Sequence, residues 1–225
     1  MRISQLAPPV VSLALGLSAL VIGGPSISAQ DCAATPENAW RLAREAVATK
    51  DAGKVMERLS PAYRTQNSIE TAVGASMVIE MTGFSADGAK TPAAKAKIQA
   101  TEKQLLAELD ALLKKYKAFT IKEIGTPRFR RMEAPEVVAK FAPIDHVAFA
   151  REMETLFAKV EAASKAAGGD SEPVKLDELV VGGGDLNATL SGLKNTGDTA
   201  AAAAGKVTMK FRKIGGCWLI DGREG

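Results

Sequence analysis

The spacing of apolar residues changes once along this chain, and that change limits the folds it can adopt. As far as Ala166, apolar side chains recur every three to four residues, the repeat of helices that bury one face. Beyond the glycine run at 182–184, Val207, Met209 and Phe211 alternate with polar residues, the repeat of a half-buried strand. The pattern predicts an α+β fold, with N-terminal helices packed on a C-terminal antiparallel sheet.

Caps and prolines divide the helical part into segments. The first helix is expected to begin after Thr35, because a capping threonine is followed there by a proline, and to bury Trp40 on its apolar stripe. Further helices are predicted at 54–59, 68–81 and 90–116, and another is expected to start at the capping residue Asp145. Residues 30–225 are interpreted as one α+β domain in which 68–166 is a helical insertion or subdomain.

The helix at 90–116 is the longest that the pattern predicts. Its buried seam is expected to consist of apolar residues at helical spacing, namely Ile98, Leu105, Leu109, Leu112 and Tyr116. Asp110 and Lys114 are four residues apart and are expected to form an ion pair on the opposite, solvated face.

The β-rich tail is predicted over residues 186–222. Strands are expected at 186–193, 199–204 and 207–212, and 217–220 returns as a partner strand after the turn at Gly215-Gly216. Alanine favours helix, but the position of 199–204 between two strand-like segments favours a strand. Trp218 follows the glycine turn and is expected to be buried.

The first 29 residues have the layout of a secretory signal peptide. Arg2 is the only charged residue before Asp31, an apolar run spans 10–22, and small residues end the segment at Ser28-Ala29. The run is shorter than the ~20 residues of a membrane-spanning helix. We therefore expect cleavage after Ala29 and a periplasmic or secreted protein without stable membrane insertion; a retained membrane anchor is the alternative.

The chain contains two cysteines, Cys32 and Cys217, near the opposite ends of the expected mature protein. In an oxidising compartment an even pair predicts a disulfide, with two separate buried thiols as the alternative. The sequence has one histidine, and neither cysteine has a second cysteine at the spacing of metal ligands. No metal site and no cofactor are therefore predicted. The formal net charge of +3 provides no electrostatic footprint for nucleic acid.

Two parts of the chain together resemble a known family. The first part is a helix, a break and a short helix that ends in Leu-Ser-Pro, at 40–51 and 54–61. The second part is the C-terminal region at 195–200, 207–212 and 215–222, and its last segment reads Gly-Gly-Cys-Trp-Leu-Ile-Asp-Gly. They are similar to exported bacterial proteins of the nuclear-transport-factor-2-like, or cystatin-like, α+β cone. The resemblance implies a cone-shaped cavity in a fold that hosts enzymes, carriers and scaffolds, and it transfers no functional residue.

No catalytic residue is predicted. Asp145 next to His146 could form an acid–base pair, but the favoured interpretation is a helix cap with His146 facing solvent or Met153. The candidate ligand-binding residues are Tyr63, Met77 and Met81, because the methionines lie on a helix that could cover a cavity.

These observations favour an exported, non-catalytic binding or accessory protein of the cell envelope. Its expected partner is a small apolar ligand, held between sheet and helices, or another envelope protein. One alternative is a small isomerase or hydratase that uses an acidic base in the cone with Tyr63. The other is a scaffold whose helix at 90–116 docks a partner or a second copy of the chain, giving a homodimer.

Overall fold

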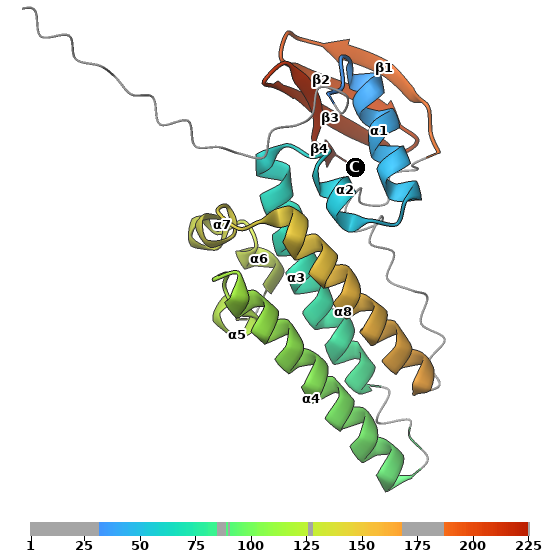
Figure 1. Cartoon of the computed structure of the whole chain (residues 1–225), viewed down its shortest axis with the longest axis vertical. Coiled ribbons are helices and arrows are strands. Elements are labelled where there is room, and N and C mark those ends of the chain that lie inside the picture. The colour runs from blue at the N-terminus through green and yellow to red at the C-terminus, as the bar shows by residue number, and fades with distance from the viewer. Residues whose placement is uncertain (1–31, 85–88, 90, 126–127, 168–186, 225) are drawn as a thin grey trace, which may run out of the picture.

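A computed structural model describes residues 32–84, 89, 91–125, 128–167 and 187–224, which form a sheet-containing head and a helical stalk (Figure 1). The head consists of α1, α2 and the strands β1–β4, and the stalk of α3–α8. The predicted α+β class is therefore confirmed, with the helices preceding a C-terminal antiparallel sheet. The signal peptide predicted at 1–29 lies outside the described residues.

The sheet is a four-stranded antiparallel meander in the order β1-β2-β3-β4. Its strands are β1 (Leu190–Asn195), β2 (Thr199–Ala204), β3 (Val207–Ile214) and β4 (Cys217–Glu224), and α1 (Pro36–Ala48) lies across one face (Figure 1). The predicted strand at 199–204 is confirmed. Every second alanine of this strand, namely Ala200, Ala202 and Ala204, is buried in the head core. Alanine favours helix in isolation, but here its small side chain packs beneath a helix, and this packing outweighs the propensity.

The head core includes both tryptophans. Trp40 and Trp218 are 3% and 4% exposed, as predicted from the sequence. The indole N–H of Trp40 donates a hydrogen bond to the carbonyl of Ala188, just before β1, at 3.0 Å. This bond satisfies the polar atom of a buried ring and joins α1 to the chain that enters the sheet.

The predicted disulfide joins Cys32 to Cys217 at the edge of the sheet. Next to it, the backbone N–H of Trp218 donates to the carbonyl of Ala33 at 2.9 Å, and Ile220 makes two further backbone hydrogen bonds to the loop between α2 and α3. The outer edge of β4 is thus covered by other parts of the chain, which satisfies backbone groups that an edge strand leaves open.

Three long helices form the stalk and lie side by side (Figure 1). They are α3 (Pro61–Phe84), α4 (Pro92–Lys115) and α8 (His146–Ala166), and the short helices α5 (Ile121–Ile124), α6 (Arg128–Arg131) and α7 (Pro135–Phe141) connect α4 to α8. Their shared core is separate from that of the head. Its largest fully buried side chains are Ile69, Ile79, Leu109, Leu113, Ile124, Phe141, Phe149 and Met153.

Several helix boundaries differ from the predicted ones. α3 begins at Pro61 instead of residue 68, because proline suits the first turn and the Ser60 hydroxyl accepts a hydrogen bond from the Tyr63 N–H at 3.2 Å. α2 (Ala52–Met56) begins earlier than residue 54, since the Asp51 carboxylate caps it through the Lys54 N–H. The short helices α5–α7 were not predicted, because four to seven residues are too few to show a helical period.

Contacts between α2 and α8 fix the head on the stalk. The guanidinium of Arg151 donates to both carboxylate oxygens of Asp51, at 3.0 and 3.3 Å, and the Ala52 N–H donates to the Glu154 carboxylate at 3.2 Å. Gly53 lies directly beneath the guanidinium, where a Cβ atom would stand 2.5 Å from the Arg151 Nε. Glycine at this position therefore leaves room for the ion pair that joins head and stalk.

Candidate functional site

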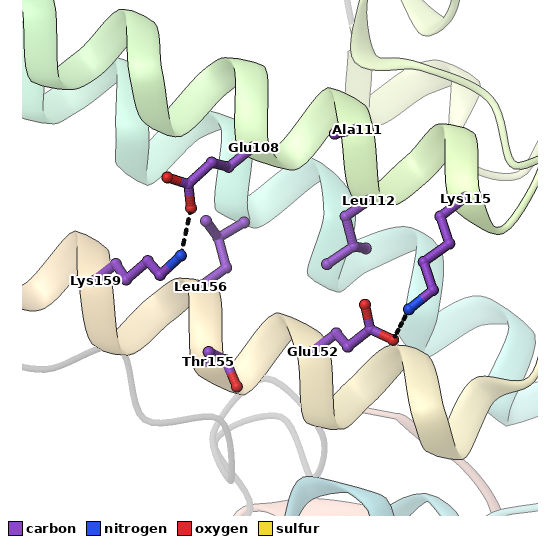
Figure 2. A pocket seen from close by; sticks show the side chains of 8 residues that line it. All are labelled: Glu108, Ala111, Leu112, Lys115, Glu152, Thr155, Leu156 and Lys159. Carbon is purple, nitrogen blue, oxygen red and sulfur yellow. Dashed lines mark hydrogen bonds and ion pairs between the residues drawn. The ribbon is translucent and has the colours of Figure 1, made fainter.

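A groove of about 440 Å³ runs between α4 and α8 on the surface of the stalk (Figure 2). It is lined from α4 by Glu108, Ala111, Leu112 and Lys115, and from α8 by Glu152, Thr155, Leu156 and Lys159. Leu112 and Leu156 form an apolar floor, whereas the charged side chains stand at the two ends (Figure 2). The site thus combines an apolar centre with a polar rim, the usual anatomy of a protein contact surface.

Two ion pairs cross the groove, one at each end. Lys159 donates to Glu108 at 2.7 Å and Lys115 donates to Glu152 at 2.6 Å (Figure 2). The Glu152 carboxylate also accepts a hydrogen bond from the Tyr116 hydroxyl at 2.7 Å. These contacts hold the four charged groups at defined positions around the apolar floor.

The same contacts shift the pKa values of the carboxyl groups. Hydrogen bonds from Lys159 and then Gln104 lower the pKa of Glu108, and hydrogen bonds from Lys115 and then Tyr116 lower the pKa of Glu152. Both side chains are thereby held as carboxylates at neutral pH. Neither has the raised pKa that a general acid or base in a groove would need.

The two walls carry the same sequence pattern. Residues 108–115 read Glu-x-x-Ala-Leu-x-x-Lys and residues 152–159 read Glu-x-x-Thr-Leu-x-x-Lys. The glutamate of each helix pairs with the lysine of the other, so the helices are antiparallel and the groove has local pseudo-twofold symmetry. The Glu-to-Lys spacing of seven residues corresponds to ~10 Å along each helix.

The predicted buried seam of α4 is correct at Leu105 and Leu109, which are 4% and 1% exposed. Leu113, which is fully buried, takes the place expected for Leu112. Leu112 is half-buried and lines the groove instead. An exposed stripe of Leu105, Leu109 and Leu112, the feature expected of a scaffold helix, is therefore absent; the predicted Asp110–Lys114 ion pair is present at 2.6 Å.

His146 lies in the first turn of α8, and Asp145 caps that helix through the N–H groups of Val147 and Ala148, as predicted. The expectation that His146 faces solvent or Met153 is wrong. Its Nδ1 shares a 2.8 Å hydrogen bond with the Ser68 hydroxyl of α3, because the start of α8 packs against a buried polar face of that helix.

Burial lowers the pKa of His146 to about 4, so the ring is neutral at pH 7. A serine beside a neutral histidine can act as a nucleophile only if substrate reaches it. Ser68 is fully buried, and the second ring nitrogen, Nε2, lies 3.4 Å from the Thr65 hydroxyl. This pair therefore joins α3 to α8, and it has no access for substrate.

The structure does not bring the three candidate ligand-binding residues together. Tyr63 is 8% exposed and belongs to the head core, whereas Met77 packs at the edge of the stalk core and Met81 is 64% exposed. Burial raises the pKa of the Tyr63 hydroxyl, which lies within electrostatic reach of Arg223 and Glu70. Tyr63 thus lies in the packed head, in a core separate from the stalk core against which Met77 packs.

Within the described ranges, no three His, Cys, Asp or Glu residues are grouped so that they could hold a metal ion. Among the helices that the structure describes, none is both long enough and apolar enough to cross a membrane. Sequence reasoning missed the groove. The signal that could have found it is the repeated Glu-x-x-small-Leu-x-x-Lys pattern on two predicted helices.

Comparison with known proteins gave no match. No protein-family model, no curated protein and no solved structure is detectably similar to this chain.

Proposed function

We propose that this chain is an exported, non-catalytic accessory protein of the cell envelope that docks a protein partner in the groove between α4 and α8. The observation that carries the proposal is the arrangement of that groove, an apolar floor between two fixed ion pairs. Its partner would present apolar side chains to Ala111 and Leu112, which are exposed and half-buried, and charged groups of alternating sign to the rim.

Export is supported by the paired cysteines and by the pattern of the first 29 residues. The disulfide between Cys32 and Cys217 is of the kind that persists in oxidising compartments. The segment 1–29 has the charge, length and small-residue layout of a cleaved leader.

A protein partner suits the groove better than the small apolar ligand expected from the sequence. Lys115 and Lys159 at its ends are 61% and 55% exposed, so the groove is open and its rim is wet. Sites for small apolar ligands are concave and bury most of the ligand surface. The proposed relation to the nuclear-transport-factor-2-like proteins concerns the head alone, where α1 lies across an antiparallel sheet that ends in the predicted hairpin.

Site-specific photo-crosslinking in the native cell envelope tests the docking function. A photoreactive amino acid replaces Ala111, which is exposed in the groove, or Ala48, an exposed alanine on α1 that serves as the matched control. We expect a covalent protein adduct from position 111 and none from position 48. Equal adducts from both positions, or none from position 111, would count against the proposal. Recovery of both variants from the cytoplasm would count against export.

A further inference from the structure

We infer that the partner of the α4–α8 groove is a second copy of this chain, docked face to face across a twofold axis. This inference rests on the proposed function, in which the groove is a docking surface. It is carried by the distribution of charge around the groove, which is complementary to itself.

The four charged groups at the corners of the groove alternate in sign. Lys115 of α4 and Glu152 of α8 stand at one end, and Glu108 of α4 and Lys159 of α8 stand at the other end (Figure 2). Each positive corner therefore has a negative neighbour both along its own helix and across the groove.

A face with this alternation complements a copy of itself. A twofold axis parallel to the helices places Lys115 opposite the second copy's Glu152, and Glu108 opposite its Lys159. A twofold axis across the helices places Lys115 opposite the second copy's Glu108, and Glu152 opposite its Lys159. In both arrangements every corner meets the opposite charge, as the self-complementary interface of a symmetric dimer requires.

The side chains between the corners allow close approach. Ala111 and Thr155 are small and exposed, and Leu112 between the corners is half-buried, whereas Leu156 is 4% exposed and belongs to the stalk core. The ion pairs place residues 101–115 of α4 beside residues 152–166 of α8, so the shared face measures roughly 22 Å by 20 Å, or about 450 Å² for each copy. Because a standard interface buries about 800 Å² for each partner, this face is below the standard size, and we expect a weak dimer that forms only at high protein concentration.

The test is sedimentation velocity of the oxidised mature chain, from low to several hundred micromolar, at low and high salt. We expect a monomer–dimer equilibrium that weakens with added salt, since the corner charges are exposed to solvent. Lys159→Glu sets like charges against each other at two contacts of the dimer, and it should raise the dissociation constant by about tenfold or more. Lys206→Glu, on the exposed turn between β2 and β3, is the control and should dimerise as the parent does.

A fourfold variant separates an effect on folding from an effect on docking. E108K/K115E/E152K/K159E exchanges every corner charge, so both ion pairs within the chain are kept with their signs reversed. It should dimerise with itself as the unmodified protein does. In a mixture with the unmodified protein it should form no mixed dimer, because every corner would then meet its own sign.

A wild-type protein that stays monomeric at the highest concentration would overturn the inference. So would a Lys159→Glu variant that dimerises as well as the parent, or a fourfold variant that mixes freely with it. If the purified protein is monomeric while position 111 captures a different protein in the envelope, the second copy is excluded and the docking function stands. If it is monomeric and position 111 captures nothing, both proposals fail.

Discussion

Removing the disulfide between Cys32 and Cys217 should destabilise the folded protein by several kcal/mol. Replacing both Cys32 and Cys217 with alanine leaves no free thiol that could form other bonds. The bond closes a loop with a sequence separation of 185 residues. For a loop of that size the chain-entropy model gives about 5 kcal/mol, since the cross-link removes many conformations from the unfolded chain. Residual structure in the unfolded state reduces that value, so we expect a loss of about 3–5 kcal/mol.

The native fold should survive the change. The hydrogen bond between the Trp218 N–H and the Ala33 carbonyl, at 2.9 Å, keeps the first described residues beside β4 without the cross-link. The circular dichroism spectrum of the double alanine variant should therefore match that of the oxidised protein at low temperature. Its denaturant m-value should be higher, because an unfolded chain without the cross-link exposes more surface.

Urea unfolding of the oxidised protein, the reduced protein and the double alanine variant measures the effect. The reduced protein and the variant should agree with each other, and both should be less stable than the oxidised protein. A difference between oxidised protein and variant below about 1 kcal/mol, with an unchanged m-value, would refute this account of the bond.

Three further predictions concern the stalk and its junction with the head. The pKa of His146 is about 4 in the folded protein and about 6.5 in the unfolded chain, so the folded state binds fewer protons. The free energy of unfolding is therefore unaffected by this group above about pH 6.5 and falls as the pH falls toward 4. At pH 5 the loss is already about 2 kcal/mol. His146→Asn should remove that part of the pH dependence in urea unfolding at pH 7 and pH 5. Gly53→Ala should displace the Arg151 guanidinium, and an NMR titration should then show that the lowered pKa of Asp51 has risen. The free energy of unfolding should change by less than about 1 kcal/mol, because the Arg151–Asp51 pair is exposed and alanine favours helix. Leu109→Ala, at a side chain 1% exposed in the stalk core, should cost about 2–5 kcal/mol in urea unfolding.

Each of these three has its own control. An identical pH dependence for the parent and His146→Asn would contradict the role of burial at that ring. An unmoved Asp51 pKa in Gly53→Ala would show that the guanidinium does not need the space over the glycine. Leu112→Ala is the matched control for Leu109→Ala, since Leu112 is half-buried in the groove, and equal losses for the two would contradict the packing of α4.

The parts of the fold that the sequence predicted have local causes. Thr35 and Asp145 cap their helices because their side chains accept hydrogen bonds from nearby backbone N–H groups, which depends on a few neighbouring residues. The hairpin at Gly215-Gly216 follows from two positive-φ residues in a tight turn. Residues 199–204 could be assigned to a strand only because the segments on both sides are strand-like, since alanine alone favours helix.

The groove and the environment of His146 depend on contacts between distant residues. Glu108 and Lys159 are 51 positions apart, and Ser68 and His146 are 78 apart, so their pairing depends on how the helices pack; the pattern repeated at 108–115 and 152–159 suggests related faces but does not show that they meet. On α4, leucines at 112 and 113 are equally apolar, and only the packing of the other stalk helices decides that Leu113 is buried and that Leu112 lines the groove. Periodicity identifies a helix, but two adjacent leucines do not show which face is covered.

Covalent labelling of lysines in the unmodified protein tests the docking surface most directly. Lys115 and Lys159 are exposed at the ends of the groove, and Lys206 is exposed on the head and serves as the internal control. Acetylation of each lysine is quantified by mass spectrometry in the intact cell envelope and in dilute purified protein. If the groove is a docking surface, Lys115 and Lys159 will react several-fold less in the envelope than in dilute solution, while Lys206 reacts equally in both. Equal reactivity of Lys115 and Lys159 in the two samples would contradict the account.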